Sequence, residues 1–338
     1  MICFFGDDFS VIGGVETTTY NLQKELYRKY GLKTDVFSLC KSMESSEEFH
    51  LLPFNYKIKY ISIIASFLYL SRAGYTQIVT SYFAFNIINI VMSKILGYKA
   101  IIQEHASSKS YSRCKLVFIF LFYRFAHKFI VLNKFDKVFY NRMRLKPIIM
   151  MNCYTYEKEF YGVEGRQYYL VLARLDDNKR VHLAIESWLT YKKNGGRYRL
   201  VVVGNGPCFN SLVAKYKETG VEFKGSKRHV KHYLIKARAL IITSKLECYP
   251  TVAIEGKYVG TPSIAFNVPS GLRDIIMSGV DGILVPDGNC KRMAKAMLDL
   301  DSDVCLTNMV SHAYKSSDSF NANKSVDEYF KLFEGDKI

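Results

Sequence analysis

Short apolar runs alternate with longer stretches of helical periodicity along the first half of the chain. The segment 15–30 has apolar or neutral residues at 15, 18, 22, 26 and 30, which is the spacing of one helix face. Gly31 is a natural stop for that helix, and further helices are expected over 83–96 and 114–126. The apolar runs predict strands over 2–5, 34–39, 77–81, 100–103 and 128–132. Such an alternation indicates a parallel sheet.

The second half of the chain repeats this pattern. Its run 199–203 is so apolar that both faces of the strand must be covered, as in a parallel sheet. Strands are expected over 168–172, 199–203, 221–223, 240–243, 263–266 and 282–285. Helices are expected over 181–193, 208–219, 229–237, 251–259, 270–278 and 290–300. The chain therefore reads as an α/β protein with two halves of similar, Rossmann-like build.

The two halves divide the chain into domains. We expect a first domain over 1–155, a second over 156–320, and a C-terminal helix within 321–338. In that last segment Val326, Tyr329, Phe330 and Phe333 follow the i, i+3, i+4, i+7 spacing. An amphipathic helix this short needs a surface to cover, so we expect it to pack back across the domains.

Charge distinguishes this chain from an average globular protein. Its 338 residues carry a formal net charge of +16, and most of the excess lies in the first half. Such a balance implies a polyanionic partner, which is a nucleic acid, an anionic membrane or a phosphorylated substrate. The hydrophobic share of 49% argues against intrinsic disorder.

Basic and aromatic residues are interleaved between Arg113 and Lys146. This mixture fits an anionic membrane interface, and it also fits single-stranded nucleic acid. A third interpretation is that the aromatic residues are core and the charges are simply solvated. No helix-turn-helix, zinc-finger or RNA-binding signature accompanies the charge, so a membrane is favoured over nucleic acid.

The cysteines and the N-terminus suggest a reduced, cytoplasmic protein. The eight cysteines are scattered without CxxC spacing, so neither a zinc site nor a disulfide framework is expected. Residues 1–6 lack the basic region and cleavage site of a signal peptide. The apolar runs 58–70 and 116–122 are shorter than the ~20 residues of a membrane-spanning helix.

One candidate binding loop follows the strand that ends near Thr243. Glu247 lies in this loop, Pro250 is placed as the first residue of the next helix, and Glu255 lies one turn into that helix. The amides of Thr251 and Val252 would be unpaired at the helix N-terminus, which is a prepared anion site. Carboxylates suit a pair of vicinal hydroxyls, although both glutamates alone could be solvated helix residues.

A second candidate loop, 173–179, follows the strand 168–172. Arg174 offers a planar guanidinium and Lys179 a point charge, and together they could clamp a diphosphate. The alternative is an ordinary charged surface loop.

Three other features have weaker signals. Gly13 and Gly14 separate the first strand from the first helix, where glycine lets a phosphate or sugar approach closely, and His105 follows the strand 100–103. The segment 299–303 contains an Asp-x-Asp pair, which we interpret as a solvated turn after the last helix rather than a metal site. His229 and His232 lie among basic residues that read as a solvated face.

Taken together, these motifs resemble the retaining glycosyltransferases of family 4, and most closely those that build bacterial capsule or lipopolysaccharide chains. The resemblance is strong over 168–300 and weaker over 1–150. It rests on Ala173-Arg174-Leu175 with Lys179, Gly204-Asn205-Gly206-Pro207, Glu247 with Glu255 (Glu-x7-Glu), Pro269-Ser270-Gly271 with Asp274, and Asp281-Gly282 with Val285-Pro286. The resemblance implies the GT-B fold, in which two Rossmann-like domains face a central cleft.

The resemblance also implies roles for the matching residues. Arg174 and Lys179 would hold the donor diphosphate, Glu255 the ribose and Glu247 the reacting sugar. The backbone of Gly204, Asn205 and Gly206 and of Tyr249, Pro250, Thr251 and Val252 would contact the donor. Gly14 would touch donor and acceptor, and Gly13 and His105 the acceptor, with His105 facing the reacting sugar. Cys248 and Pro250 stand where glycines are common, and Gly256 where alanine is usual.

The expected function is therefore transfer of a sugar from a nucleotide diphosphate-sugar to a hydroxyl of a lipid-linked glycan. UDP is the expected nucleotide and GDP the alternative, with no metal or other cofactor, because Arg174 and Lys179 can serve the diphosphate. The enzyme would work peripherally on the inner face of the cytoplasmic membrane. Two alternatives remain, a nucleotide-sugar 2-epimerase of the same fold and a non-enzymatic basic protein that binds membrane or nucleic acid.

Overall fold

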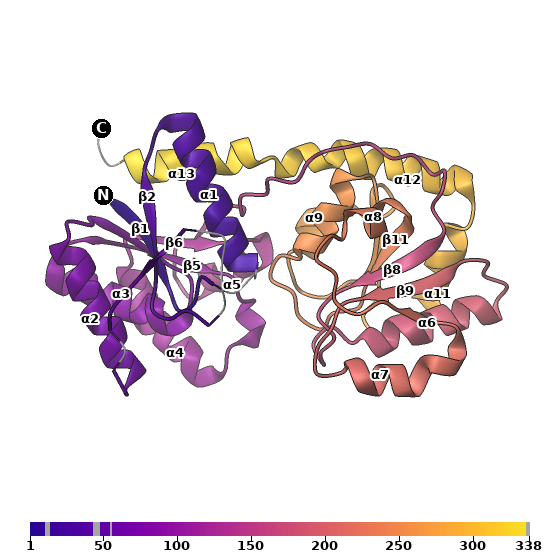
Figure 1. Cartoon of the computed structure of the whole chain (residues 1–338), viewed down its shortest axis with the longest axis horizontal. Coiled ribbons are helices and arrows are strands. Elements are labelled where there is room, and N and C mark those ends of the chain that lie inside the picture. The colour runs from indigo at the N-terminus through magenta and orange to yellow at the C-terminus, as the bar shows by residue number, and fades with distance from the viewer. Residues whose placement is uncertain (11–13, 43–47, 55, 336–338) are drawn as a thin grey trace. The chain divides into compact units, whose positions relative to one another are not determined.

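The computed structural model describes residues 1–10, 14–42, 48–54 and 56–335. The chain folds as two compact units (Figure 1). Unit 1 comprises Met1–Thr155 together with Asn321–Ile338, and unit 2 comprises Tyr156–Phe320. The chain thus leaves unit 1, builds the whole of unit 2, and returns to unit 1 for its last helix.

Unit 1 is built on a parallel sheet with the strand order β3-β2-β1-β4-β5-β6-β7. The central strand β1 pairs on one side with β2 and on the other with β4, so that Ile2 lies between Thr34 and Gln77. Its strands are β1 (Ile2–Gly6), β2 (Thr34–Ser38), β3 (His50–Leu51), β4 (Gln77–Thr80), β5 (Lys99–Glu104), β6 (Lys128–Val131) and β7 (Ile148–Ile149).

Helices cover both faces of this sheet (Figure 1). Cys3 and Phe5 of β1 point into a core with α2 to α5, and Ile2 and Phe4 point into a core with α1 and α13, as the two-residue alternation of a strand requires. The helices of unit 1 are α1 (Gly14–Tyr30), α2 (Lys59–Arg72), α3 (Phe83–Leu96), α4 (Arg113–Phe122), α5 (Lys134–Arg142) and α13 (Ala322–Glu334), with 3₁₀ turns at Ser108–Ser110 and Tyr123–Phe125.

The C-terminal helix α13 is an integral part of unit 1, where it lies beside α1 (Figure 1). Phe333 is fully buried and meets Phe4 edge-on at 6.3 Å between ring centroids. Gln77 donates a 2.8 Å hydrogen bond to the Phe333 carbonyl, and Gln103 donates one of 2.7 Å to the Tyr329 hydroxyl. The helix is thereby fixed to β4 and β5 as well as to α1.

Unit 2 has a second parallel sheet, in the order β10-β9-β8-β11-β12-β13. Its strands are β8 (Tyr168–Leu172), β9 (Arg199–Val203), β10 (Glu222–Phe223), β11 (Ala237–Ile242), β12 (Ser263–Phe266) and β13 (Gly282–Val285). Its helices are α6 (Val181–Lys193), α7 (Phe209–Tyr216), α8 (Lys231–Ile235), α9 (Thr251–Tyr258), α10 (Leu272–Ile275), α11 (Cys290–Asp299) and α12 (Asp303–Ser316), with 3₁₀ turns at Lys217–Thr219 and Ser317–Phe320.

The segment 299–303 is only in part the solvated turn that the sequence suggested, because Asp299, Ser302 and Asp303 are exposed whereas Asp301 is not. Asp301 is buried and accepts hydrogen bonds from the hydroxyls of Tyr169, at 3.0 Å, and Tyr191, at 2.8 Å. These donors offset the cost of removing a carboxylate from water. The segment also does not follow the last helix of unit 2, because a further helix, α12, begins at Asp303. The Asp303 carboxylate pairs with the buried Arg238.

The apolar run 58–70 proves to be most of the helix α2. The helix expected over 270–278 is shorter, since only Leu272–Ile275 is helical, and the strand expected at 240–243 already begins at Ala237. In the described part of the chain, no helix has both the length and the apolar character needed to cross a membrane.

Replacing Phe333 by alanine should destabilise unit 1, because the substitution leaves a cavity against Phe4 in a closed core. We expect a loss of about 3–5 kcal/mol in the free energy of unfolding, measured by urea denaturation. The matched control is Lys331→Ala on the exposed side of the same helix, which should change it by no more than about 0.5 kcal/mol. Equal effects of the two substitutions would show that α13 contributes no core packing.

Candidate active site

The two candidate loops of unit 2 are brought together because β8 and β11 are neighbours in the sheet. Asn178 ties the loops to each other. Its side-chain amide donates to the Leu246 carbonyl at 2.9 Å and accepts from the Leu246 amide at 3.1 Å. Its backbone carbonyl accepts from the Lys245 amide at 2.7 Å. Both loops follow the carboxyl ends of parallel strands, the edge at which open α/β sheets bind ligands.

The loop after β9 packs against the loop after β8 so closely that it requires glycine. At Gly204 (φ +141°) a Cβ atom would lie 1.8 Å from the Ala173 carbonyl oxygen, and at Gly206 (φ +157°) 2.5 Å from that of Leu175. Backbone hydrogen bonds hold the two loops in this position, including one of 2.9 Å from the Leu175 amide to the Asn205 carbonyl. The glycines thus serve the approach of backbone to backbone.

A cavity of about 390 Å³ opens at this edge of the unit 2 sheet. It brings together several residues singled out from the sequence, namely Arg174, Gly204, Asn205, Thr251, Val252 and Glu255. The remaining lining residues are Leu172, Ala173, Val203, Ser226, Lys227 and Val230. Residues from the ends of β8 and β9 and from the start of α9 therefore form a single site.

Charges of both signs line this cavity. Arg174 and Lys227 supply cations, and Arg174 is largely exposed, with its Nε 3.5 Å from a carboxylate oxygen of Asp176. Glu255 supplies the carboxylate, and burial raises its pKa, although hydrogen bonds from Tyr156 and Thr251 act in the opposite direction. Cations suit the phosphates of a ligand, and a carboxylate suits its hydroxyls.

Lys179 and Glu247 do not line the cavity but pair with each other beside it. The Lys179 ammonium donates a hydrogen bond to Oε1 of Glu247, and both side chains are mostly buried. Each charge is thus neutralised by the other. A diphosphate would compete with Glu247 for Lys179.

The start of α9 differs in one respect from the sequence prediction. Pro250 is the N-cap residue, with extended backbone (φ −71°, ψ 106°), so the helix begins at Thr251. Tyr249 is buried beside Gly271, where a Cβ atom would lie 2.4 Å from the Cys248 carbonyl oxygen. Neither Tyr249 nor Pro250 lines the cavity.

His105 lies in unit 1, directly after β5. Its Nε2 is 3.2 Å from the side-chain oxygen of Gln103, and burial lowers its pKa to about 4, so the imidazole is neutral at pH 7. The preceding Glu104 is buried, which raises its pKa to about 7, and its carboxylate accepts hydrogen bonds from Asn86, Tyr111 and Tyr123.

The first loop contains the two glycines Gly13 and Gly14. Gly14 begins α1, and a Cβ atom added there would meet no heavy atom within 4 Å, so the fold itself does not require glycine. Gly13 lies outside the described residues.

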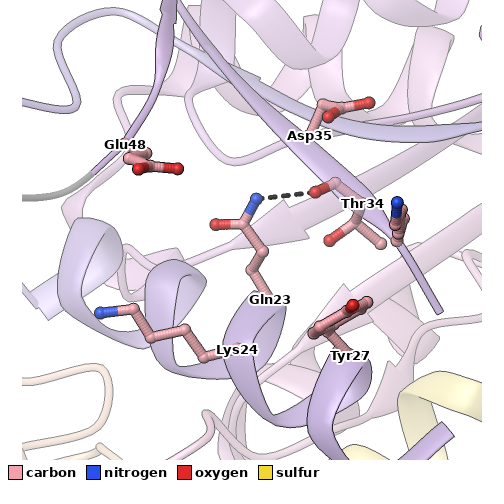
Figure 2. A pocket seen from close by; sticks show the side chains of 7 residues that line it. Gln23, Lys24, Tyr27, Thr34, Asp35 and Glu48 are labelled. Carbon is pink, nitrogen blue, oxygen red and sulfur yellow. Dashed lines mark hydrogen bonds between the residues drawn. The ribbon is translucent and has the colours of Figure 1, made fainter. Parts of the chain in front are cut away.

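A second cavity, of about 520 Å³, lies in unit 1 (Figure 2). Gln23, Lys24 and Tyr27 of α1 face Thr34 and Asp35 at the start of β2, and Gln23 donates a 2.7 Å hydrogen bond to the Thr34 carbonyl. It lies at the amino end of β2, away from the edge at which such sheets bind ligands, and no residue singled out from the sequence lines it.

Sequence reasoning missed three contributors to the unit 2 site. Lys227 belongs to the stretch that was interpreted as a solvated basic face, yet it lines the cavity. No motif or spacing in the sequence singles out Asn178 or Tyr156, and only the side-chain contacts just described identify them. Among the described residues, no group of three or more His, Cys, Asp or Glu side chains is placed to hold a metal ion.

Residues 156–315, nearly the whole of unit 2, match the family described as glycosyl transferases group 1. Unit 2 is therefore a group 1 glycosyltransferase domain, and the chain is a glycosyltransferase. These matches favour an enzyme over the non-enzymatic binding protein that was one of the alternatives from the sequence.

Two curated relatives align with a large part of the chain. The first, from Campylobacter jejuni, is the GalNAc-alpha-(1->4)-GalNAc-alpha-(1->3)-diNAcBac-PP-undecaprenol alpha-1,4-N-acetyl-D-galactosaminyltransferase. It is 29% identical over 242 residues, which cover 69% of this chain and 67% of that protein. The second, the amylovoran biosynthesis glycosyltransferase AmsD of Erwinia amylovora, is 28% identical over 58% of this chain and 59% of that protein.

The fold as a whole is shared with a solved structure, Anabaena HepE in complex with UDP. The two structures have a TM-score of 0.81, with 14% identity, and the match covers 99% of each chain. The expected α/β architecture of two Rossmann-like domains is confirmed.

The His105 imidazole should stay neutral well below pH 6, because burial disfavours its charged form. We expect an NMR titration midpoint near pH 4, followed through the ring ¹⁵N resonances and assigned by comparison with His105→Gln. A midpoint above pH 6 would show that water reaches the ring and that His105 can carry a positive charge near neutral pH.

Proposed function

We propose that this glycosyltransferase transfers a sugar, with retention of configuration, from a nucleotide diphosphate-sugar to a hydroxyl of a lipid-linked glycan in cell-surface polysaccharide synthesis. The observation that carries the proposal is the unit 2 cavity, which Arg174, Lys227 and Glu255 line together at the carboxyl edge of the sheet. Two cations and a carboxylate in one cavity match a ligand that carries both phosphates and a sugar diol.

UDP is the nucleotide we propose, with GDP as the alternative. HepE, whose fold this chain shares, is described in complex with UDP. Glu255 would accept hydrogen bonds from the ribose hydroxyls, and Arg174 would bind the diphosphate together with Lys179, drawn from its pair with Glu247. Glu247, released in turn, would bind the hydroxyls of the transferred sugar. The amides of Thr251 and Val252 and the backbone of 204–206 would complete the donor site.

In the proposed step, the anomeric carbon loses its bond to the diphosphate oxygen and forms one to the acceptor oxygen on the same face. The acceptor proton passes to the departing phosphate. Arg174 and Lys179 stabilise the negative charge that develops on the diphosphate, so the chain's own cations can serve this step without a metal. Retention and the front-face course are implied by the family resemblance.

We assign the acceptor to unit 1, where Gly13, Gly14 and His105 follow β1 and β5. A neutral imidazole at His105 can exchange hydrogen bonds with sugar hydroxyls without attracting the diphosphate. The proposal of a lipid-linked glycan draws support from the Campylobacter relative, named for an undecaprenol-linked substrate, and the Erwinia relative, named for amylovoran synthesis.

A lipid-linked acceptor requires access to a membrane, and unit 1 carries a surface suited to one. Helix α3 packs between α2 and α4 (Figure 1). Each of the three helices presents large apolar side chains to solvent. These side chains include Tyr60, Ile61 and Ile64 of α2, Val91 and Ile95 of α3, and Val117, Phe118, Phe120 and Leu121 of α4. Exposed apolar side chains on neighbouring helices mark a candidate interaction surface.

The charges around these helices favour an anionic membrane. Between Leu51 and Phe135 the sequence contains one carboxylate side chain, Glu104, and that side chain is buried. Of the aromatic residues between Arg113 and Lys146, Tyr123, Phe129 and Tyr140 are core, whereas Phe118, Phe120 and Phe125 are exposed. We propose that this face lies on the inner leaflet of the cytoplasmic membrane, with cations contributing ~1 kcal/mol each.

Glu255→Ala and Arg174→Ala should each reduce kcat/KM for sugar transfer by at least about 100-fold, because each removes a charged partner of the donor. Transfer is measured with a radiolabelled UDP-sugar and a polyprenol-linked glycan, and circular dichroism checks the fold. Lys324→Ala, in unit 1, is the control and should transfer normally. Unchanged turnover in either donor-site variant contradicts the assignment, and free epimerised nucleotide-sugar without acceptor would favour the epimerase.

Co-sedimentation with liposomes tests the membrane face. We expect binding to vesicles with anionic lipid and much weaker binding to neutral ones. Replacing both Phe118 and Leu121 by serine should lower the affinity about tenfold, because each loses apolar surface. Val304→Ser is the matched control, since Val304 is an exposed apolar residue of unit 2. Equal binding to anionic and neutral vesicles would contradict the role of charge.

A further inference from the structure

Tyr156 is the first residue of unit 2, at the point where the chain passes over from unit 1. Its hydroxyl donates a 2.7 Å hydrogen bond to Oε1 of Glu255, which lies almost one hundred residues further along the chain. Tyr156 belongs to none of the motifs recognised in the sequence and does not line the cavity. It touches the proposed site through the Glu255 carboxylate.

The position of the Tyr156 ring is set by the helix that carries Glu255. The ring meets that of Tyr258 edge-on, with centroids 5.8 Å apart and planes at 71°. Tyr258 is the last residue of α9 and is buried, and its own hydroxyl donates a 3.0 Å hydrogen bond to the Phe320 carbonyl. Because α9 supplies both the ring contact and the carboxylate, the hydroxyl of Tyr156 is held at a fixed place relative to Glu255.

This hydrogen bond is important because the Glu255 carboxylate is largely shielded from solvent. Burial raises the pKa of Glu255, which disfavours the charged form, and the hydrogen bonds from Tyr156 and Thr251 favour it. An ionised carboxylate has about four acceptor positions on its two oxygens. Tyr156 and Thr251 together occupy two of these positions, so the carboxylate keeps two acceptor positions for a ligand.

We propose that Tyr156 is a positioning residue, which holds the Glu255 carboxylate ionised and oriented to receive the vicinal hydroxyls of the donor ribose. The inference rests on the proposed function, since it takes Glu255 to bind a nucleotide. It also makes a prediction about the ligand: Tyr156 raises the affinity only for a nucleotide whose hydroxyls bind Glu255. A tyrosine that merely packs against Tyr258 would affect all nucleotides alike.

The test is calorimetric binding of UDP and of 2′,3′-dideoxy-UDP to the full chain and to Tyr156→Phe, which keeps the ring but removes the hydroxyl. UDP should bind about 5- to 20-fold more weakly to the variant. This lies at the low end of the roughly 10- to 150-fold range for a lost hydrogen bond to a charged group, because Tyr156 acts on the nucleotide through Glu255. The dideoxy nucleotide should change by less than about twofold. Tyr198→Phe is the matched control, a half-buried tyrosine of unit 2 that does not line the cavity.

A second measurement places Tyr156→Phe in a Glu255→Gln background. If Tyr156 acts through the carboxylate, the added substitution should not weaken UDP binding further. Four outcomes would each overturn the inference: an equal loss of affinity for both nucleotides, no loss, tighter binding of UDP, or full additivity with Glu255→Gln. In each case, UDP binding by the unaltered chain leaves the proposed function intact. Failure of the unaltered chain to bind UDP or GDP would instead refute the proposed function, and the inference with it.

Discussion

The proposed donor site depends on the way Asn178 joins the loops that follow β8 and β11. Strand pairing brings the two loops to the same edge of the sheet, but pairing alone does not fix the position of their side chains. Three hydrogen bonds from one residue do so, and they involve the backbone at Lys245 and Leu246 just before Glu247. Because Lys179 is adjacent to Asn178, the same contacts set the distance across which Lys179 and Glu247 can meet.

The site combines rigid and adaptable parts. Gly204 and Gly206 are confined by carbonyl oxygens of the neighbouring loop, so the backbone that borders the cavity has little freedom to move. Arg174 is largely exposed and free to change rotamer. Lys179 and Glu247 neutralise each other until a ligand competes, which avoids leaving either charge buried and unpaired.

The sequence predicted the strands that are apolar runs between polar segments. It missed the two-residue edge strands β3 and β7, and it failed where an exposed surface is itself apolar. Helix α2 shows little contrast between its faces, since Tyr60, Ile61 and Ile64 face solvent while Ile63 and Phe67 are core, and its periodicity is therefore weak. The burial of Asp301 could not be foreseen, because its hydroxyl partners come from Tyr169 and Tyr191, far away in sequence. In the same way, spacing alone cannot single out Lys227 from the basic residues around it.

The return of the chain to unit 1 bears on the order in which the protein is built. The face of the first sheet that carries Phe4, Val79 and Ile101 is completed by Val326, Tyr329 and Phe333, which are synthesised after the whole of unit 2. Unit 2 is the continuous segment Tyr156–Phe320, so its synthesis is complete before that of α13 begins. During translation unit 2 can therefore fold first. The sheet of unit 1, although it is made earlier, keeps one apolar face exposed until α13 packs against it.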